Sequence, residues 1–219
     1  MKREALLLGV HDAMLAGLGP SHWWPGETPF EIALGAILTQ NTAWTNVEKA
    51  LHNLRSETLL HPPALYELPE QALAELIRPA GFFRIKARRV RNFLHFLHET
   101  CDLDMEELRS RDMSTLRARL LDISGIGPET ADSILLYALD FPSFVVDAYT
   151  RRILNRHGLV PEDIGYEELR DYFMDVLPAD TPLFNEFHAL LVRVGKTWCA
   201  KKTPRCAGCP LAPFLDREP

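Results

Sequence analysis

The first residues to suggest chemistry are two glycines, Gly125 and Gly127, in a short turn that leads into a helix expected to begin at Pro128. Glycine adopts positive φ angles and lets another chain approach the backbone closely. A helix N-terminus presents free N–H groups and the positive end of the helix dipole, and proline is common at its first position. The turn is therefore a candidate phosphate site, although a glycine-rich connection between two helices has the same pattern.

A carboxylate, Asp147, follows 20 residues after Gly127, between the apolar run 144–146 and a basic helix. Aspartate is a preferred N-cap, because its side chain accepts hydrogen bonds from the first backbone N–H groups of a helix. The spacing alone therefore allows two interpretations, a functional carboxylate or a cap for the helix 148–157.

Aromatic side chains occur in three polar or glycine-rich segments. Trp23 and Trp24 precede Pro25 in a loop, Trp44 follows the polar stretch 39–42, and Phe82 follows a glycine. Two adjacent tryptophans cannot both face one core, so one of them lines a surface or a pocket; packing beneath the loop is the alternative. For Phe82, burial in the core is the usual outcome for an aromatic residue.

Three cysteines are crowded near the C-terminus with the spacing Cys199-x6-Cys206-x2-Cys209. Thiols so close in sequence are typical of a metal site in a reducing compartment rather than of a disulfide framework. The remaining cysteine, Cys101, is remote in the sequence.

The elements that must position these residues are all predicted to be helices, because apolar residues recur with helical spacing and no stretch alternates like a strand. With 219 residues, the chain can form one large domain or two small ones. Helical patterns are expected at 4–18, 29–38, 44–54, 63–68, 70–78, 85–99, 114–121, 128–138, 148–157, 166–177 and 183–196.

The charge and hydropathy of the chain restrict its partners. A net charge of −6 argues against a general polyanion binder. It does not exclude a DNA enzyme, because attraction at a phosphate is local and is screened beyond about 8–10 Å. No apolar stretch approaches the roughly 18 residues of a membrane span. Basic residues gather in three local clusters, at 84–91, 151–156 and 196–205.

The turn, its helix, the Val-Val-Asp segment and the basic helix together resemble the helix-hairpin-helix DNA glycosylases of the endonuclease III superfamily, over roughly Pro29 to Pro210. The resemblance implies two helical domains with the active site in the cleft between them. One is a helical barrel that includes the hairpin, at 29–138; the other is made of both termini, at 1–28 and 139–219, and carries the aspartate and the cysteine loop.

The resemblance also implies roles for individual residues. Gly125 and Gly127 would hold a DNA phosphate, and Arg151 would add a basic contact to DNA. A glycosylase must extrude its target nucleotide from the duplex, and the gap must be filled. Gln40 matches the polar plug of the family, and Phe82 matches the apolar wedge that enters the opposite strand.

Asp147 matches the catalytic aspartate of the superfamily. A carboxylate beside an oxocarbenium-like sugar stabilises the cation and can orient the attacking water. Bifunctional members carry a lysine within Gly-x-Gly-x-Lys, where this chain has Glu129. A carboxylate cannot form a Schiff base, which needs an amine. We therefore predict a monofunctional glycosylase without efficient lyase activity.

For the substrate, the Trp23-Trp24-Pro25 loop and Trp44 are similar to the 3-methyladenine DNA glycosylases of this superfamily, in which such aromatics sandwich the flipped base. N-alkylated purines carry positive charge, and an electron-rich aromatic slot attracts a cation by roughly 0.5–2 kcal/mol. The charged base is also a good leaving group, so one aspartate suffices without a cofactor.

The cysteine spacing matches the first three ligands of the four-iron four-sulfur loop of the superfamily, but the fourth position is Leu215. Three outcomes stay open: a cluster with a non-cysteine or open fourth site, a labile or zinc-substituted site, or a decayed loop without metal. The resemblance favours a bound, structural and easily lost cluster.

The sequence thus predicts a monomeric base-excision-repair glycosylase that acts on damaged double-stranded DNA, with no membrane partner, in the cytoplasm of a bacterial or archaeal cell and associated with the nucleoid. The alternatives are an endonuclease III-like glycosylase for oxidised pyrimidines or mismatches, and a binding protein for damaged DNA that lacks catalysis.

Overall fold

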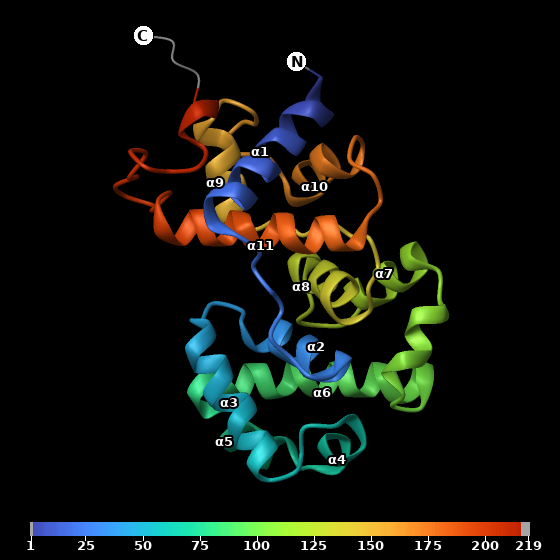
Figure 1. Ribbon diagram of the computed structural model, residues 1–219. Helices are drawn as coiled ribbons and strands as arrows, with labels where there is room; N and C mark the ends of the chain where they lie inside the picture. The colour runs from blue at the N-terminus through green and yellow to red at the C-terminus, as the bar shows by residue number, and fades with distance from the viewer. Residues whose placement is uncertain (1, 216–219) are drawn as a thin grey trace. The chain divides into compact units, whose positions relative to one another are not determined.

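The computed structural model describes residues 2–215, and every regular element in that range is helical (Figure 1). This confirms the all-α class predicted from the sequence. None of these helices is both long and apolar enough to cross a membrane. The α-helices are α1 (Arg3–Leu18), α2 (Pro29–Leu38), α3 (Trp44–Ser56), α4 (Pro62–Glu67), α5 (Glu70–Leu76), α6 (Phe83–Cys101), α7 (Met113–Leu121), α8 (Pro128–Ser133), α9 (Ala148–Arg156), α10 (Tyr166–Met174) and α11 (Thr181–Thr197). Shorter turns are η1 (Arg78–Ala80), η2 (Met105–Ser110), the π-helical η3 (Ile134–Ala138) and η4 (Ala212–Phe214).

The helices form two compact units. One consists of residues 24–141 and contains α2 to α8. The other combines the chain up to Trp23 with the chain from Pro142 onward, so that the first and the last helices share a core.

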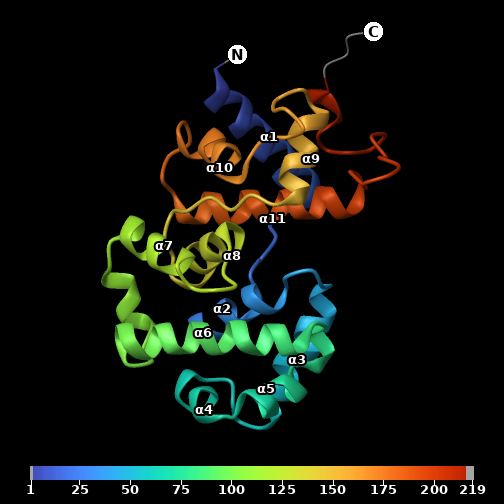
Figure 2. The ribbon, with the colours of Figure 1, turned by 180° about the vertical axis from the view of Figure 1, so that it is seen from behind.

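In the unit 24–141, the long helix α6 supports α2, α4 and α5 (Figures 1 and 2). Its apolar side chains recur every three or four residues and form one buried stripe. Helix α2 is central to this unit, because eight of its ten residues are buried. Thr28 caps α2 by accepting a hydrogen bond from the Glu31 N–H (3.1 Å), and Pro29 at the first helical position fixes the start of the helix.

In the other unit, α1 and α9 pack on α11 (Figure 1). Gly195 permits the close approach of α9, because a Cβ there would lie 2.3 Å from a ring carbon of Tyr149. Arg193 of α11 fastens the end of α1 by donating hydrogen bonds to the carbonyls of Leu18 (2.7 Å) and Gly19 (2.8 Å). The core between these helices is aromatic and contains Phe144, Phe173, Phe184 and Phe187.

Candidate active site and DNA interface

Asp147 is the N-cap of α9. Its Oδ1 accepts hydrogen bonds from the backbone N–H (2.7 Å) and the hydroxyl (3.0 Å) of Thr150. Asp147 therefore has the capping role that the sequence allowed, and the capping hydrogen bonds use only one of its two carboxylate oxygens. The second oxygen, Oδ2, lies 3.8 Å from Nε2 of His188 on α11.

The surroundings of Asp147 keep it ionised. The side chain is only 12% exposed, and burial by itself would raise the pKa of Asp147. The interaction with His188 and the hydrogen bonds from Thr150 outweigh this and lower the pKa below its ordinary value. Because the pKa is lowered on folding, the ionised carboxylate stabilises the fold at neutral pH, and this contribution is lost as the pH falls through the lowered pKa. A buried, ionised carboxylate suits the stabilisation of a cation.

His188 is a site residue that the sequence analysis missed. It lies on the buried face of α11, with its side chain 8% exposed. In the sequence it is one histidine within an apolar helical stripe, where a core role is the ordinary interpretation. Only the packing of α9 on α11 brings it to Asp147.

The turn at residues 125–127 joins α7 to α8, so the predicted hairpin is formed. Gly125 has φ +98°, which favours glycine, and a Cβ there would lie 2.3 Å from the side chain of Arg89. Gly127 has an extended conformation, and a Cβ there would meet nothing within 4 Å. The two glycines therefore differ in their role. The backbone conformation and the packing on Arg89 require a glycine at position 125, whereas at position 127 the space before the N-terminus of α8 is open.

Gln40 is bound to this hairpin. Its Nε2 donates to the Thr130 hydroxyl (2.8 Å) and to the Gly125 carbonyl (3.2 Å), and its Oε1 accepts from Arg89 of α6. The side chain predicted to fill the gap in the duplex and the turn predicted to hold a phosphate thus form one hydrogen-bonded group. Arg89, which contacts both, was predicted only as a member of the basic cluster 84–91.

Phe82 is 68% exposed, in the left-handed conformation (φ +46°) directly before α6. The alternative of a core residue is therefore wrong. Ile85, one turn later, is 55% exposed, so the start of α6 presents two large apolar side chains to solvent. Such a protrusion suits insertion into a duplex better than it suits folding.

Lys86 is an unexpected buried charge beneath this protrusion, with 1% exposure. Its ammonium group donates hydrogen bonds to the carbonyls of Ala80 (2.7 Å) and Leu38 (2.8 Å). Burial, together with the charge of Arg89, lowers the pKa of Lys86 to about 8. Lys86 thereby anchors the segment before Phe82 and the segment before Gln40 to the same helix. It is not a surface cation, although its sequence places it in the basic cluster 84–91.

Of the three tryptophans predicted to form a base pocket, the structure brings two together, Trp24 and Trp44. Trp24 packs edge-on against Trp44, with ring centroids 5.1 Å apart. It also packs against Tyr137, with centroids 5.0 Å apart and the rings tilted by 49°. Gly35 lets both indoles approach α2, because a Cβ there would lie 3.2–3.3 Å from them. Trp23 belongs to the other unit, and Pro25 is exposed. Since Trp24 and Trp44 touch edge to face, a base enters between them only if one ring turns.

Two further residues from the sequence analysis are Arg151 and Glu129. Arg151 is exposed on α9. Its neighbours are engaged within the fold: Arg152 donates to the Cys199 carbonyl (2.7 Å), and Arg156 donates to the carbonyls of Ala200 (2.8 Å) and Lys201 (2.9 Å). Glu129 is exposed in the first turn of α8.

The comparisons with known proteins decide the family. A sequence profile of the HhH-GPD superfamily of base excision DNA repair proteins matches residues 34–179, from within α2 to the end of α10 and its following loop. The chain belongs to this superfamily. The Methanocaldococcus jannaschii protein named putative DNA repair glycosylase MJ1434 is 46% identical over 211 residues, which cover 95% of each chain. Endonuclease III of Escherichia coli is 26% identical over 183 residues, covering 84% of this chain and 81% of that protein.

Solved structures agree with this assignment. The H. pylori 3-methyladenine DNA glycosylase MagIII, bound to 1,N6-ethenoadenine, superposes with a TM-score of 0.77 at 29% identity, covering 90% of this chain and 98% of that one. An endonuclease III–DNA complex superposes with a TM-score of 0.82 at 22% identity, covering 99% and 96%, and supports the fold. The protein is thus a DNA glycosylase of base excision repair.

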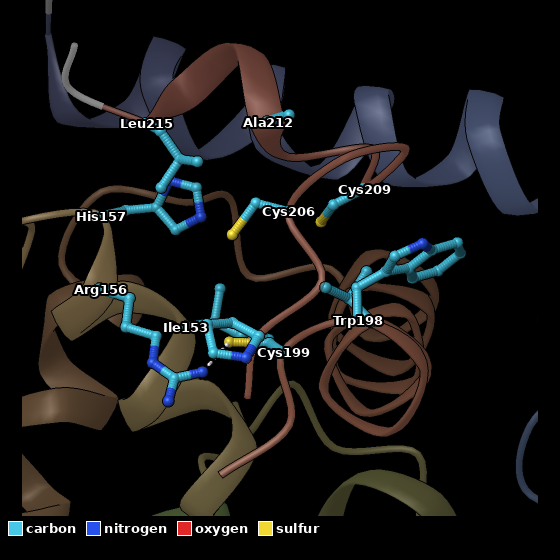
Figure 3. Close-up of a pocket in the computed structure, with 11 residues that line it drawn as sticks. Ile153, Arg156, His157, Trp198, Cys199, Cys206, Cys209, Ala212 and Leu215 are labelled. Atoms are coloured by element: carbon cyan, nitrogen blue, oxygen red, sulfur yellow. Dashed lines mark hydrogen bonds between the residues drawn. The ribbon is translucent and has the colours of Figure 1, made fainter. Parts of the chain in front are cut away.

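The cysteine loop of this glycosylase lies against the C-terminal end of α9 (Figure 3). Cys199, Cys206 and Cys209 line one pocket, together with His157 and Leu215. Burial raises the pKa of the Cys209 thiol, and the neighbouring Cys206 and Cys199 raise it further.

The side chains that line this pocket determine whether it can hold a metal group. Within residues 2–215, no three His, Cys, Asp or Glu side chains converge on a single ion position. A four-iron cluster spreads its protein ligands over separate irons, so convergence on one point is not required. Three thiols that line one pocket fit such a cluster in their chemistry. Leu215, at the position of the fourth cysteine, lines the pocket but offers no ligand atom.

Proposed function

We propose that this glycosylase is monofunctional and excises N-alkylated purines, 3-methyladenine first, from double-stranded DNA. The observation that carries the proposal is the group formed by Trp24, Trp44 and Tyr137. The likeness to MagIII, whose name includes 3-methyladenine, supports it. We further propose that residues 24–141 correspond to the barrel domain and that one chain acts alone.

The aromatic group is electron-rich and faces a cationic substrate favourably. The Trp44 indole donates a hydrogen bond to the Glu48 carboxylate (3.0 Å), which increases the electron density of the ring. A flipped purine that stacks on an aromatic side chain gains about 1–3 kcal/mol, and a positive charge on it adds roughly 0.5–2 kcal/mol. A neutral oxidised pyrimidine gains only the stacking energy. The aromatic group therefore favours alkylated purines, once a ring has turned to admit the base.

In the proposed reaction, water replaces the base at the anomeric carbon. The ionised Asp147 carboxylate stabilises the positive charge that develops on the sugar and orients the water. His188 positions the carboxylate. The departing alkylated purine carries its own positive charge, so its loss as a neutral base needs little help from an acid.

The absence of lyase activity rests on Glu129 in the first turn of α8. A carboxylate provides no amine to attack the sugar. Lys86 has an amine of lowered pKa, but it is buried and donates to two carbonyls, so it is a poor substitute. An iron–sulfur cluster held by the three cysteines would be structural and would take no part in base release.

The deciding experiment is base release from methylated duplex DNA, with the freed bases separated by chromatography and the strands examined for nicks. We expect release of 3-methyladenine with intact strands and no covalent adduct when borohydride is present. Efficient borohydride trapping would contradict monofunctional action. Release of oxidised pyrimidines or mismatched bases, with no methylated base released, would replace the proposed substrate with those of the alternative glycosylases.

Replacement of Trp44 separates the pocket from DNA binding in general. We expect Trp44→Ala to lower single-turnover excision of 3-methyladenine about 10- to 100-fold, because it removes the stacking and cation–π contributions. Affinity for an undamaged duplex, measured by fluorescence anisotropy, should change less than about 3-fold. Trp44→Phe should retain most activity.

The matched control is Tyr66→Ala, which removes an aromatic ring of the same unit that packs on His95 and His98 rather than on Trp24. It should leave excision almost unchanged. If Trp44→Ala reduces excision and duplex binding to the same extent, Trp44 has only a structural role.

A further inference from the structure

The imidazole of His157 lines the cysteine pocket. His157 follows the last residue of α9, and its backbone N–H bonds to the Ile153 and Leu154 carbonyls. Its Nδ1 is buried, yet it makes no hydrogen bond within the described part of the chain. A buried polar atom without a partner is costly, and natural proteins keep few of them. Among the buried side-chain nitrogens that make no hydrogen bond within residues 2–215, this one is distinguished because its side chain lines a pocket with three thiols, which makes it a candidate ligand.

His157 lies where it could supply the fourth ligand that the three cysteines lack. The superfamily loop would place its fourth thiol at position 215, where this chain has leucine. Figure 3 shows the His157 ring and the Cys206 and Cys209 sulfurs projecting into the same pocket, with Leu215 beside them. Histidine is an established ligand of iron–sulfur clusters, and imidazole nitrogen takes the place of thiolate in several of them.

We propose that His157 supplies the fourth protein ligand, through Nδ1, to a four-iron four-sulfur cluster held by Cys199, Cys206 and Cys209. The loss of the fourth cysteine is thereby compensated from the end of α9 rather than from the loop. Arg156, next to His157, already donates a hydrogen bond to the Cys199 sulfur (3.2 Å), which stabilises a thiolate ligand there.

This ligand would connect the cluster to α9, the helix whose N-terminus Asp147 caps. The cluster would then hold the cysteine loop against the C-terminal end of α9. The inference concerns metal binding alone and does not depend on which base the enzyme releases. Replacement of a thiolate by a neutral imidazole also raises the reduction potential of a cluster.

The test uses the full-length protein purified without oxygen. Iron, zinc and acid-labile sulfide are measured per chain. Pulsed electron paramagnetic resonance is recorded on the protein labelled with 15N-histidine after one-electron chemical reduction or oxidation, because the resting cluster has no unpaired spin. We expect iron and sulfide in equal amounts, no zinc, and a nitrogen coupling from one histidine. In His157→Cys the cluster should be retained and the nitrogen coupling should disappear.

Two more variants separate ligation from folding. His157→Ala should lose more than half of its iron, and Leu215→Cys in the same chain should restore it, because it returns the fourth thiol. His11→Ala is the matched control, since its Nε2 is also buried without a hydrogen-bond partner, but His11 lies on α1 and does not line the cysteine pocket. It should keep its iron.

Several results would overturn the proposal. They are a protein without iron, a zinc-only protein, a wild-type cluster without nitrogen coupling, and a His157→Ala variant whose iron content and spectrum equal those of the wild type. Since none of these readouts involves base release, failure here leaves the proposed function standing, and failure of base release leaves the metal result standing.

Discussion

Asp147→Asn should abolish most base release while the protein still binds DNA. Asparagine is also a good N-cap, so the hydrogen bonds to Thr150 that begin α9 can persist. What is lost is the negative charge that, in the proposed reaction, stabilises the developing sugar cation. Removal of one such electrostatic group typically slows catalysis about 10²- to 10³-fold, and we expect at least this loss in single-turnover release of 3-methyladenine.

Comparison with Asp147→Ala separates charge from structure. Alanine removes both the charge and the cap, and should cost about 1 kcal/mol of stability in addition to the loss of activity. Duplex affinity, measured by anisotropy, should be maintained in Asp147→Asn. A variant that releases base at the wild-type rate would show that Asp147 is only a cap. A wild-type protein that binds damaged DNA but releases no base would favour the non-catalytic alternative.

The parts of this site that the sequence could predict are those encoded locally. A turn with two glycines, a proline at a helix start and an aspartate before a basic helix are signals within a few residues of one another. They are found as a hairpin at 125–127 and as the N-cap of α9. The predicted helix at 29–38 is also local, because Thr28 and Pro29 define its start.

The parts that could not be predicted depend on contacts between distant segments. Lys86 and Leu38 are 48 residues apart, and nothing near Lys86 in the sequence indicates that its ammonium group binds two carbonyls. A signal existed, because Lys86 falls on the buried stripe of α6 with Ala87 and Val90. That stripe argues against a surface cation. His188 and His157 gave no such signal, since a histidine is compatible with either a core or a surface.

The relative orientation of the aromatic rings also could not be predicted from the sequence. It predicted a base pocket from Trp24 and Trp44, and the structure brings the two rings together, but edge to face. Tyr137, on the π-helical turn η3, joins them and had not been noticed. A π-helical turn displaces side chains from the ordinary helical register, so a period of 3.6 residues does not predict where Tyr137 points.

A buried ion pair joins the two helices that flank the hairpin turn, and we expect its loss to have the largest effect on stability. Arg117 of α7 donates two hydrogen bonds to the Asp132 carboxylate of α8, from Nε (2.8 Å) and from Nη2 (2.9 Å). The Asp132 side chain has no exposure, and that of Arg117 is 16% exposed. The pair joins the two helices on either side of the turn that is predicted to hold a phosphate.

We expect Arg117→Ala to lower the free energy of unfolding by about 3–5 kcal/mol, because it leaves the buried Asp132 carboxylate without its bidentate partner. Urea denaturation followed by circular dichroism measures this loss. Arg119→Ala is the control on the same helix. Its exposed guanidinium contacts Thr100 and Phe96, and its removal should cost less than about 1 kcal/mol.

The double variant Arg117→Met/Asp132→Leu tests the reason for the effect. If the cost arises from an uncompensated buried charge, removing both charges should recover most of the stability that Arg117→Ala loses. Equal losses in the single and double variants would mean instead that the hydrogen-bond geometry itself holds the hairpin. In that case the double variant should also bind duplex DNA weakly, because the turn at 125–127 would no longer be held in place between α7 and α8.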